Sequence, residues 1–235
     1  HRIYQLVHNF CAVDMGGFYL DIIKDRQYTT QADSIPRRSA QTAMFHVVES
    51  LVRWLAPILS FTAEEIWRAL PGERGESVFL TTWYELPPAF FSESEILQRM
   101  GSNFWDRIIS LRDAVSKELE KLRGSGAIGS PLDAEVDIYT DEETHVLLNA
   151  LEDELRFVLF TSYARVHDLQ DAPEDAIVAE LPDMNVRIRV TPSQHAKCIR
   201  CWHHREDVGS IAEHPELCGR CVENVAGEGE VRRYA

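Results

Sequence analysis

Four cysteines near the end of the chain constrain its fold more than any other feature of the sequence. They form two pairs, Cys198-x2-Cys201 and Cys218-x2-Cys221, with sixteen residues between the pairs. Two such pairs bring four thiolates to one tetrahedral point, which suits zinc at Zn–S distances of about 2.3 Å. Because the protein fills all four positions, the predicted zinc ion is structural and leaves no place for a reactive water.

Other interpretations of the cysteines stay open on the sequence. The four thiols could be free or form a redox pair, and His203, His204 or His214 could replace one of them as a ligand. A catalytic cysteine is disfavoured because the sequence shows no general base and no orienting residue at a spacing typical of a nucleophilic cysteine. The fifth cysteine, Cys11, falls on the apolar face of a predicted helix and is expected in the core. An odd cysteine count with metal-type spacing favours a reducing compartment, so we expect a cytoplasmic protein.

The length of the chain predicts more than one module. Its 235 residues exceed an average domain of about 150 residues. We expect a mainly α, α+β fold made of a helical domain (1–91), an α+β connecting module (92–194) and a zinc finger (195–235). No stretch approaches the roughly 18 charge-free apolar residues of a membrane helix, so a soluble protein is expected. The chain begins in helical register without Met, which indicates a piece of a longer protein.

The first helix is predicted over residues 3–23, where apolar residues recur at steps of three and four. Gly16 and Gly17 lie inside it and each costs about 1 kcal/mol relative to alanine. We therefore expect another backbone to approach this turn closely.

Two further helices complete a predicted antiparallel bundle over residues 1–70. Ser34 is a plausible cap and Pro36 a first-turn proline for the second helix. Thr62 and Glu65 form a capping-box pattern for the third. Such helices pack against each other through their apolar stripes.

The middle module alternates helical and strand patterns. The glycine-rich run 124–129 superficially resembles a phosphate loop, but it follows a helix and precedes a strand, so it is interpreted as a turn. The predicted elements are a helix from Ser92 to Gly124, a strand over 132–139, a short helix from Thr140 to Leu155, and strands over 157–166 and 186–190.

The net charge of -14 would normally argue against a polyanionic partner such as RNA. Residues 93–194 carry 11 of these 14 excess negative charges, however. The two ends of the chain remain free to present basic faces, and the middle is a poor place for RNA.

Binding is the remaining function, because no catalytic centre is visible and the abundant carboxylates fall on solvated helix faces. Trp202 directly follows Cys201 and is surrounded by cations, which is typical of a site that stacks an unpaired base. Trp202 could instead pack the cysteine knuckle, the turn that carries Cys198 and Cys201, onto the rest of the protein. The cations near the first two helices could simply be favourable charges at helix ends. The candidate RNA-binding residues are Trp202, Arg200, Arg205, Arg220, Lys24, Arg26, Arg37 and Arg38.

Several runs of residues resemble a known family. They are DMGGFYLDIIKDR (14–26), RWLAPILSFTAEEIW (53–67), IGSPLDAEV (128–136), CIRCWHHREDVG (198–209) and HPELCGRC (214–221). The first two runs alone would fit class I valyl- or leucyl-tRNA synthetases. The cysteine module resembles that of bacterial isoleucyl-tRNA synthetases specifically. The resemblance covers the whole chain, which is similar to the C-terminal third of these enzymes.

The resemblance implies a helical anticodon-binding domain, a connecting module and a zinc finger that together hold the anticodon stem-loop of isoleucine tRNA. It further implies upstream catalytic and editing domains, with ATP and magnesium used only in the catalytic one. The two nucleotide-binding signatures of the family's catalytic domain do not occur in this sequence, so the fragment alone is expected to be non-catalytic. It is also expected to be a monomer. Cys198, Cys201, Cys218 and Cys221 match the family's zinc ligands, and Trp202 matches its aromatic near the anticodon. Met15-Gly16 stands where the family more often has Leu-Ser.

Two other classes of function remain as alternatives. DNA-repair glycosylases end in a related four-cysteine finger, but they would also need an N-terminal Pro-Glu region and a helix-two-turn-helix. A protein-interaction scaffold would use the acidic middle module.

Overall fold

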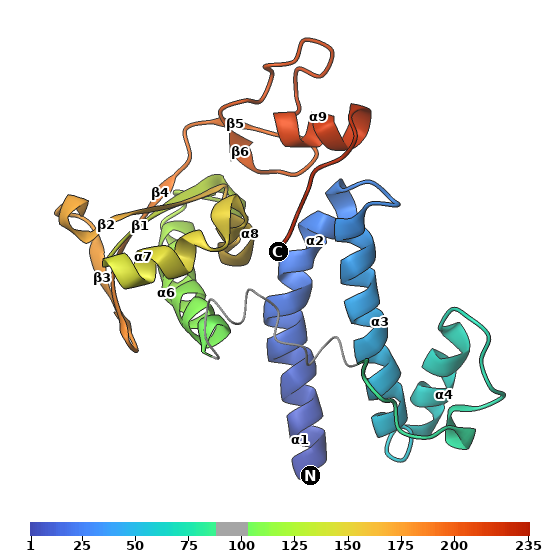
Figure 1. Ribbon diagram of the computed structural model, residues 1–235. Coiled ribbons are helices and arrows are strands. Elements are labelled where there is room, and N and C mark those ends of the chain that lie inside the picture. Colours follow the sequence, from blue (N-terminus) through green and yellow to red (C-terminus); the bar gives the residue numbers. More distant parts are fainter. Residues whose placement is uncertain (88–102) are drawn as a thin grey trace.

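The first 29 residues form one long helical rod. The computed structural model describes residues 1–87 and 103–235 of the chain. Helix α1 (Arg2–Asn9) continues into a π-helical segment η1 (Phe10–Tyr19) and then into helix α2 (Leu20–Thr29) (Figure 1). The helix predicted over residues 3–23 is confirmed, and we call residues 2–29 the rod.

The glycines of the rod lie in its π-helical segment, and within residues 1–87 and 103–235 no other backbone comes within 4 Å of a Cβ atom added to either one. A Cβ atom added to Gly16 would come 3.2 Å from the carbonyl oxygen of Cys11 in the same segment, and one added to Gly17 would lie 3.6 Å from that of Ala12. Among the described residues the second backbone predicted at this turn is absent, and the rod's own carbonyls are the nearest neighbours instead.

Cys11 is exposed, so its prediction as a core residue is also wrong. No residue of α1 or η1 is buried by the described parts of the chain, whereas Ile22 and Ile23 of α2 are buried. The apolar residues of α1 and η1 therefore follow the helical pattern of the rod, but the described residues do not bury them.

Helix α3 (Ile35–Leu55) begins as the sequence predicts. The Ser34 side chain accepts a hydrogen bond from the backbone N–H of Arg37 at 3.4 Å, and Pro36 lies in the first turn. The helix ends before Pro57. In Figure 1, α3 runs beside α2 and in the opposite direction to the rod.

Helix α4 (Ser60–Ala69) starts earlier than predicted. The backbone N–H of Leu59 donates to the carbonyl of Leu55 at 2.7 Å, so the chain turns tightly into a helix that already includes Thr62. The capping box predicted at Thr62 is therefore wrong. The core between α3 and α4 consists of Val52, Ala56, Ala63, Trp67 and Val78.

A four-stranded sheet forms the centre of the next part of the chain. Its strand order is β2-β1-β4-β3, with β1 parallel to β2 and the other pairs antiparallel. Val136, Ile138 and Ile188 of the sheet share one core with the helices of this module. The strands are β1 (Ala134–Thr140), β2 (Tyr163–Asp168), β3 (Ile177–Leu181) and β4 (Met184–Pro192). The helices are α6 (Phe104–Gly124), α7 (Glu142–Asn149) and α8 (Leu155–Leu159).

Most of this module follows the prediction. Strands occur where 132–139 and 186–190 predicted them, and the run 124–129 is a turn between α6 and β1. The helix start predicted at Ser92 lies outside the described residues.

Three details of the module differ from the prediction. The predicted strand over 157–166 begins only at Tyr163, because α8 continues to Leu159 and Phe160 then adopts a left-handed conformation with φ of 59°. The helix predicted from Thr140 to Leu155 is shorter, because Asp141, rather than Thr140, caps α7 by accepting the backbone N–H of Thr144 at 2.9 Å, and α7 ends at Asn149. Strand β3 was not predicted at all, since the sequence around it lacks a clear alternation.

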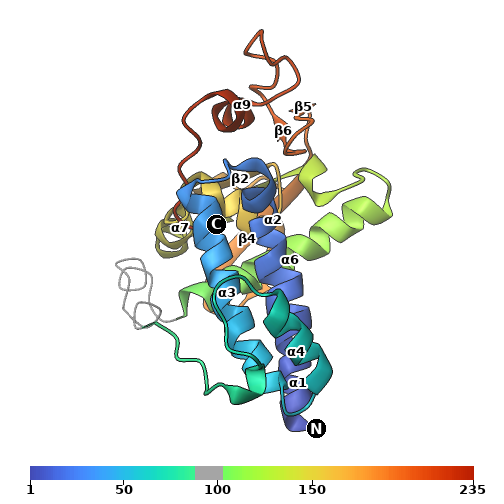
Figure 2. The same cartoon turned by 90° about the vertical axis from the view of Figure 1, so that its right-hand side faces the viewer.

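The last part of the chain, residues 195–235, is called the finger here. It contains the antiparallel pair β5 (Ala196–Lys197) and β6 (His204–Arg205) and the helix α9 (Gly219–Ala226). Figures 1 and 2 both place α9 beyond the upper end of α2. The fold is thus mixed α and β, with a small sheet and a cysteine-bearing finger.

Two further observations concern the whole described chain. Phe18 and Ile22 of the rod pack into the core of the α/β module, which joins the rod to the sheet. Among residues 1–87 and 103–235, no helix is long and apolar enough to cross a lipid bilayer.

Candidate metal centre and nucleic-acid interface

The four cysteines of the finger converge on one point. The Sγ atoms of Cys198, Cys201, Cys218 and Cys221 all lie within 4.8 Å of one another, and all four residues are buried. The Sγ atoms of Cys201 and Cys218 are 3.7 Å apart. A tetrahedral zinc ion with Zn–S bonds of about 2.3 Å requires sulfurs roughly 3.8 Å apart. The donor set and its spacing therefore fit a four-sulfur zinc site.

Local backbone structure brings these thiols together. The first pair sits in a tight turn between β5 and β6, in which the Trp202 N–H donates to the Cys198 carbonyl at 2.9 Å. The second pair lies at the start of α9, where Cys218 immediately precedes the helix and Cys221 lies in its first turn. A helix N-terminus favours negative charge, so it supports the thiolate form at this pair.

The electrostatics of the cluster call for a cation. Hydrogen bonds from the thiols of Cys201, Cys218 and Cys221 lower the pKa of Cys198. The pKa of Cys221 is raised by its hydrogen bonds to the other three thiols, of which the one to Cys198 has the largest effect. Without a cation the four sulfurs cannot all hold negative charge at this spacing, whereas a divalent ion would stabilise four thiolates.

Two of the three histidines considered as substitute ligands, His203 and His204, are engaged elsewhere. His203 is buried, and its Nδ1 lies 3.0 Å from Arg156 Nη1. Burial, followed by the nearby charge of Arg156, lowers the pKa of His203 to about 2 and keeps it neutral. His204 contacts the His195 carbonyl and Asp133. Within residues 1–87 and 103–235, the group of candidate metal ligands consists of the four cysteines.

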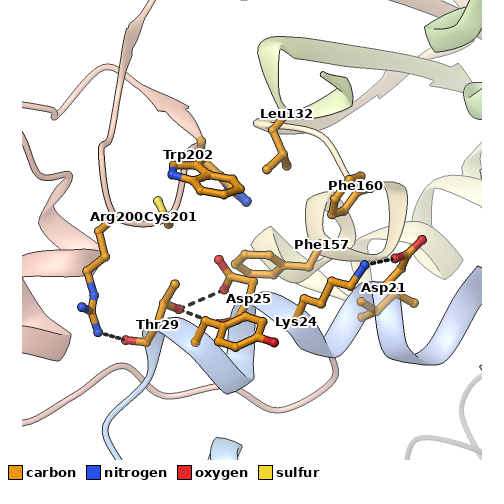
Figure 3. A pocket seen from close by; sticks show the side chains of 13 residues that line it. Asp21, Lys24, Asp25, Thr29, Leu132, Phe157, Phe160, Arg200, Cys201 and Trp202 are labelled. Atoms are coloured by element: carbon orange, nitrogen blue, oxygen red, sulfur yellow. Dashed lines mark hydrogen bonds and ion pairs between the residues drawn. The ribbon is translucent and has the colours of Figure 1, made fainter. Parts of the chain in front are cut away.

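A cavity of about 270 Å³ opens beside the first cysteine pair (Figure 3). Side chains from α2, from the turn before β1, from α8 and its end, and from the finger converge on it. Trp202 and Leu132 lie on one side of the cavity and Lys24 on the other. Its walls are largely apolar, with Phe157 and Phe160 among them.

Trp202 is exposed and held in an uncommon backbone conformation. Its exposed fraction is 63%, and its φ angle is 65°. A bulky residue at positive φ is an outlier that costs about 1–3 kcal/mol and is found mainly at functional sites. Phe160, on the same cavity, also has a positive φ. The cavity is therefore bordered by two aromatic residues in left-handed conformations.

The predicted basic residues fall into different surroundings. Arg200 and Lys24 lie at the cavity, where Arg200 donates to the Thr29 carbonyl at 3.1 Å and Lys24 pairs with Asp21 at 2.7 Å. Arg205 lies on the sheet side of the finger, 4.1 Å from the centre of a tyrosine ring.

The cations at the start of α3 lie near the upper end of the rod. Arg37 donates to the Thr30 carbonyl at 3.4 Å, and Arg38 is exposed. Arg38 is therefore available at the surface beside the α2–α3 turn, and Arg37 is half-buried there.

Arg26 and Arg220 differ from the other candidates, because their guanidinium groups face the interior of the chain. Arg26 is only 8% exposed. Arg220 is paired with Asp25 at 2.7 Å and with Glu230 at 3.0 Å. Their positions suit holding the fold together, and an RNA contact by these two arginines stays a prediction.

Sequence reasoning missed three residues of this site. Phe157 and Phe160 border the cavity. They were not predicted there because the sequence predicted a strand over this segment. Asp25, which stands between Lys24 and Arg26 in the sequence, was not predicted as a site residue. The acidic residue in an otherwise basic helix end was the available signal.

Comparison with known proteins agrees with the cysteine geometry and extends it. The family described as the anticodon-binding domain of tRNA ligase matches residues 1–138, beyond the module boundary expected after residue 91. The family described as the zinc finger found in FPG and IleRS matches residues 197–224. The match over residues 1–138 favours the tRNA-ligase interpretation over a DNA-repair glycosylase.

Curated relatives match along the whole chain. The isoleucine–tRNA ligase of Nitrosococcus oceani is 62% identical over 235 residues, which is 100% of this chain and 24% of the relative. Those of Halorhodospira halophila and Thioalkalivibrio sulfidiphilus are 60% and 59% identical, again with 100% of this chain and 24% of the relative covered. The chain thus spans about a quarter of the length of these relatives. With more than half of its residues matched by that family, the chain belongs to the anticodon-binding domains of tRNA ligases, here followed by a finger of the FPG and IleRS type.

Proposed function

We propose that the chain is the tRNA-reading part of an isoleucine–tRNA ligase and binds the anticodon stem-loop of isoleucine tRNA. The observation that carries this proposal is the exposed Trp202, held at positive φ on the cysteine knuckle beside a cavity. The names of the relatives support the choice of isoleucine tRNA. ATP- and magnesium-dependent aminoacylation and editing would lie in other parts of the polypeptide, so this chain alone would be non-catalytic. We propose a monomeric protein of the cytoplasm.

The finger would hold one structural zinc ion through Cys198, Cys201, Cys218 and Cys221. The bound ion would supply a fixed tetrahedral centre, and the four buried thiolates leave no open position for water. The role of the cysteines is then to fix the turn that carries Trp202.

The three modules would share the task. Residues 1–91 act as an antiparallel helix bundle of the anticodon-binding type, residues 92–194 connect, and residues 195–235 form the zinc finger. The opposite directions of the rod and α3 support the bundle.

Trp202 would stack on an unpaired base of the anticodon loop. Its indole offers a planar face next to a cavity with apolar walls, and every base has a π-face that can stack on it. The exposed cations would contact the phosphates around that base. The exposed cations are Arg200, Lys24 and Arg38, and the half-buried Arg205 and Arg37 would add to them.

Binding of two tRNAs tests the proposed function directly. The chain should bind isoleucine tRNA more tightly than the same tRNA with a changed anticodon, measured by filter binding at one stated salt concentration. Equal binding of the two tRNAs would contradict anticodon reading. No binding of either, together with capture of a protein partner by residues 103–194, would favour the scaffold alternative.

Replacement of Trp202 by alanine tests the stacking role. We expect Trp202→Ala to weaken isoleucine tRNA binding by about 1–3 kcal/mol, or roughly 5- to 150-fold, with unchanged zinc content. The matched control is Trp83→Ala, which removes another exposed tryptophan, one whose ring lies 6.5 Å from that of Trp54. Loss of zinc from Trp202→Ala, or unchanged RNA binding, would show that the indole packs the knuckle instead.

A further inference from the structure

The second cysteine pair is attached to helix α2 through a carboxylate. Arg220 stands between Cys218 and Cys221 in the sequence. Its Nη1 donates to Asp25 Oδ2 at 2.7 Å and its Nη2 to Asp25 Oδ1 at 2.8 Å. Such a two-bond pairing fixes the orientation of the guanidinium group as well as its distance. Asp25 therefore links the metal-binding turn to the rod.

Arg232 brings a second guanidinium group to the same carboxylate. It donates to Asp25 Oδ2, its side chain is 1% exposed, and its guanidinium carbon lies 3.5 Å from the centre of the Phe157 ring. Burial alone would raise the pKa of Asp25, but Arg220 and Arg232 outweigh burial and hold that pKa well below its usual range. The carboxylate stays charged, and both arginines rely on it.

The surroundings leave little other compensation for these cations. Glu230 is the second carboxylate, half-buried, 3.0 Å from Arg220 and 3.4 Å from Arg232. Arg26 adds a further buried cation, and its Nε has no hydrogen-bond partner within the described chain. Removing the charge of Asp25 would leave Glu230 to compensate both arginines, so part of the buried positive charge would lose its partner, which is unfavourable.

Two neighbouring contacts follow the same path between rod and finger. Arg200 donates to the Thr29 carbonyl at 3.1 Å, and Gln31 donates to the Gly227 carbonyl at 2.9 Å. The end of α2 thus meets both cysteine pairs, and it also supplies one side of the cavity that Trp202 borders. The orientation of the finger on α2 sets the position of Trp202 relative to that side.

We propose that Asp25 is a positioning residue that couples metal binding in the finger to docking of the finger on α2. This inference rests on the metal site proposed above. Metal binding fixes the turn that carries Arg220, and the ordered Arg220 then holds α2 through Asp25. Because such coupling is reciprocal, weakening the contact at Asp25 must also weaken metal binding.

The first test compares metal affinities. Zinc binding to the whole chain is measured by competition with a chromophoric chelator, for the unsubstituted chain and for Asp25→Asn. We expect Asp25→Asn to lower the affinity about 5- to 150-fold, the range typical of coupled sites. The matched control is Asp14→Asn, the same change at an exposed position of the same rod. Equal affinities of the unsubstituted chain and Asp25→Asn would overturn the coupling.

The second test needs no substitution, so it remains valid if Asp25→Asn fails to fold. Removing zinc from the unsubstituted chain should accelerate amide hydrogen exchange in residues 25–31, while the sheet strands keep their protection. Unchanged exchange in residues 25–31 would overturn the coupling. A chain that takes up no zinc at all would instead refute the proposed metal site, which separates the two failures.

Discussion

Chelation of zinc is expected to unfold residues 195–235 and leave the four-stranded sheet folded. In the finger, the cysteines are packed mainly against Val208 and Leu217, which is too little apolar surface to fold a segment of this size alone. Structural zinc contributes apparent free energies of about 10–16 kcal/mol in small fingers, so its loss should outweigh every other contact there. Far-UV circular dichroism together with hydrogen exchange would separate the two regions.

Thiol labelling gives a sharper measure of the same result. In the zinc-loaded chain only the exposed Cys11 should react quickly, and the four buried thiols should become reactive after chelation. Cys11→Ser should remove the fast reaction and leave the chelation-dependent one unchanged. Equal reactivity of all five thiols with and without chelator would contradict a metal-held finger.

Glu49→Gln is expected to destabilise the α3–α4 region by about 3–5 kcal/mol, the cost of breaking a buried ion pair from one side. Glu49 is 3% exposed and pairs with Arg53 and Arg74, each at 2.5 Å. Both guanidinium groups also stack over Trp67, at 4.9 and 4.7 Å from the ring centre. Urea unfolding followed by tryptophan fluorescence measures the change. The control Glu65→Gln removes an exposed carboxylate from α4 and should have little effect.

The same carboxylate gives this region a pH dependence. Burial opposes ionisation of Glu49, but hydrogen bonds from Arg74 and Arg53 overcome it and lower its pKa in the folded state. Its stabilising contribution is therefore complete above the unfolded-state pKa and disappears as the pH falls through the lower folded-state pKa. Glu49→Gln should lack this part of the acid dependence. An identical acid profile in both proteins would assign the loss to other groups.

Local sequence signals predicted the parts of the fold that depend on neighbouring residues. The cap at Ser34 and the first-turn Pro36 set the start of α3, and both are observed. The spacing of the cysteine pairs predicted their convergence because it depends on two short turns. Where distant contacts decide the structure, the sequence was less informative: Phe160 turns sharply at the end of α8 although its neighbours favour a strand.

The candidate site shows the same division. Trp202 was predicted to bind because it directly follows a cysteine, and its exposure is compatible with that prediction. Arg26 and Arg220 have the same charge as the surface cations, but the fold directs them inward toward carboxylates far away in the sequence. Which arginines are buried depends on how the finger docks on α2, and no local pattern contains that information.

The backbone of Trp202 has a consequence for how this loop is maintained. Glycine adopts positive φ without steric penalty, so Trp202→Gly should make the turn after Cys201 easier to form. Tryptophan at position 202 is therefore less favourable for the stability of this turn than glycine would be. Selection for stability alone would therefore favour glycine at this position, whereas selection for the proposed contact with tRNA would keep the aromatic ring.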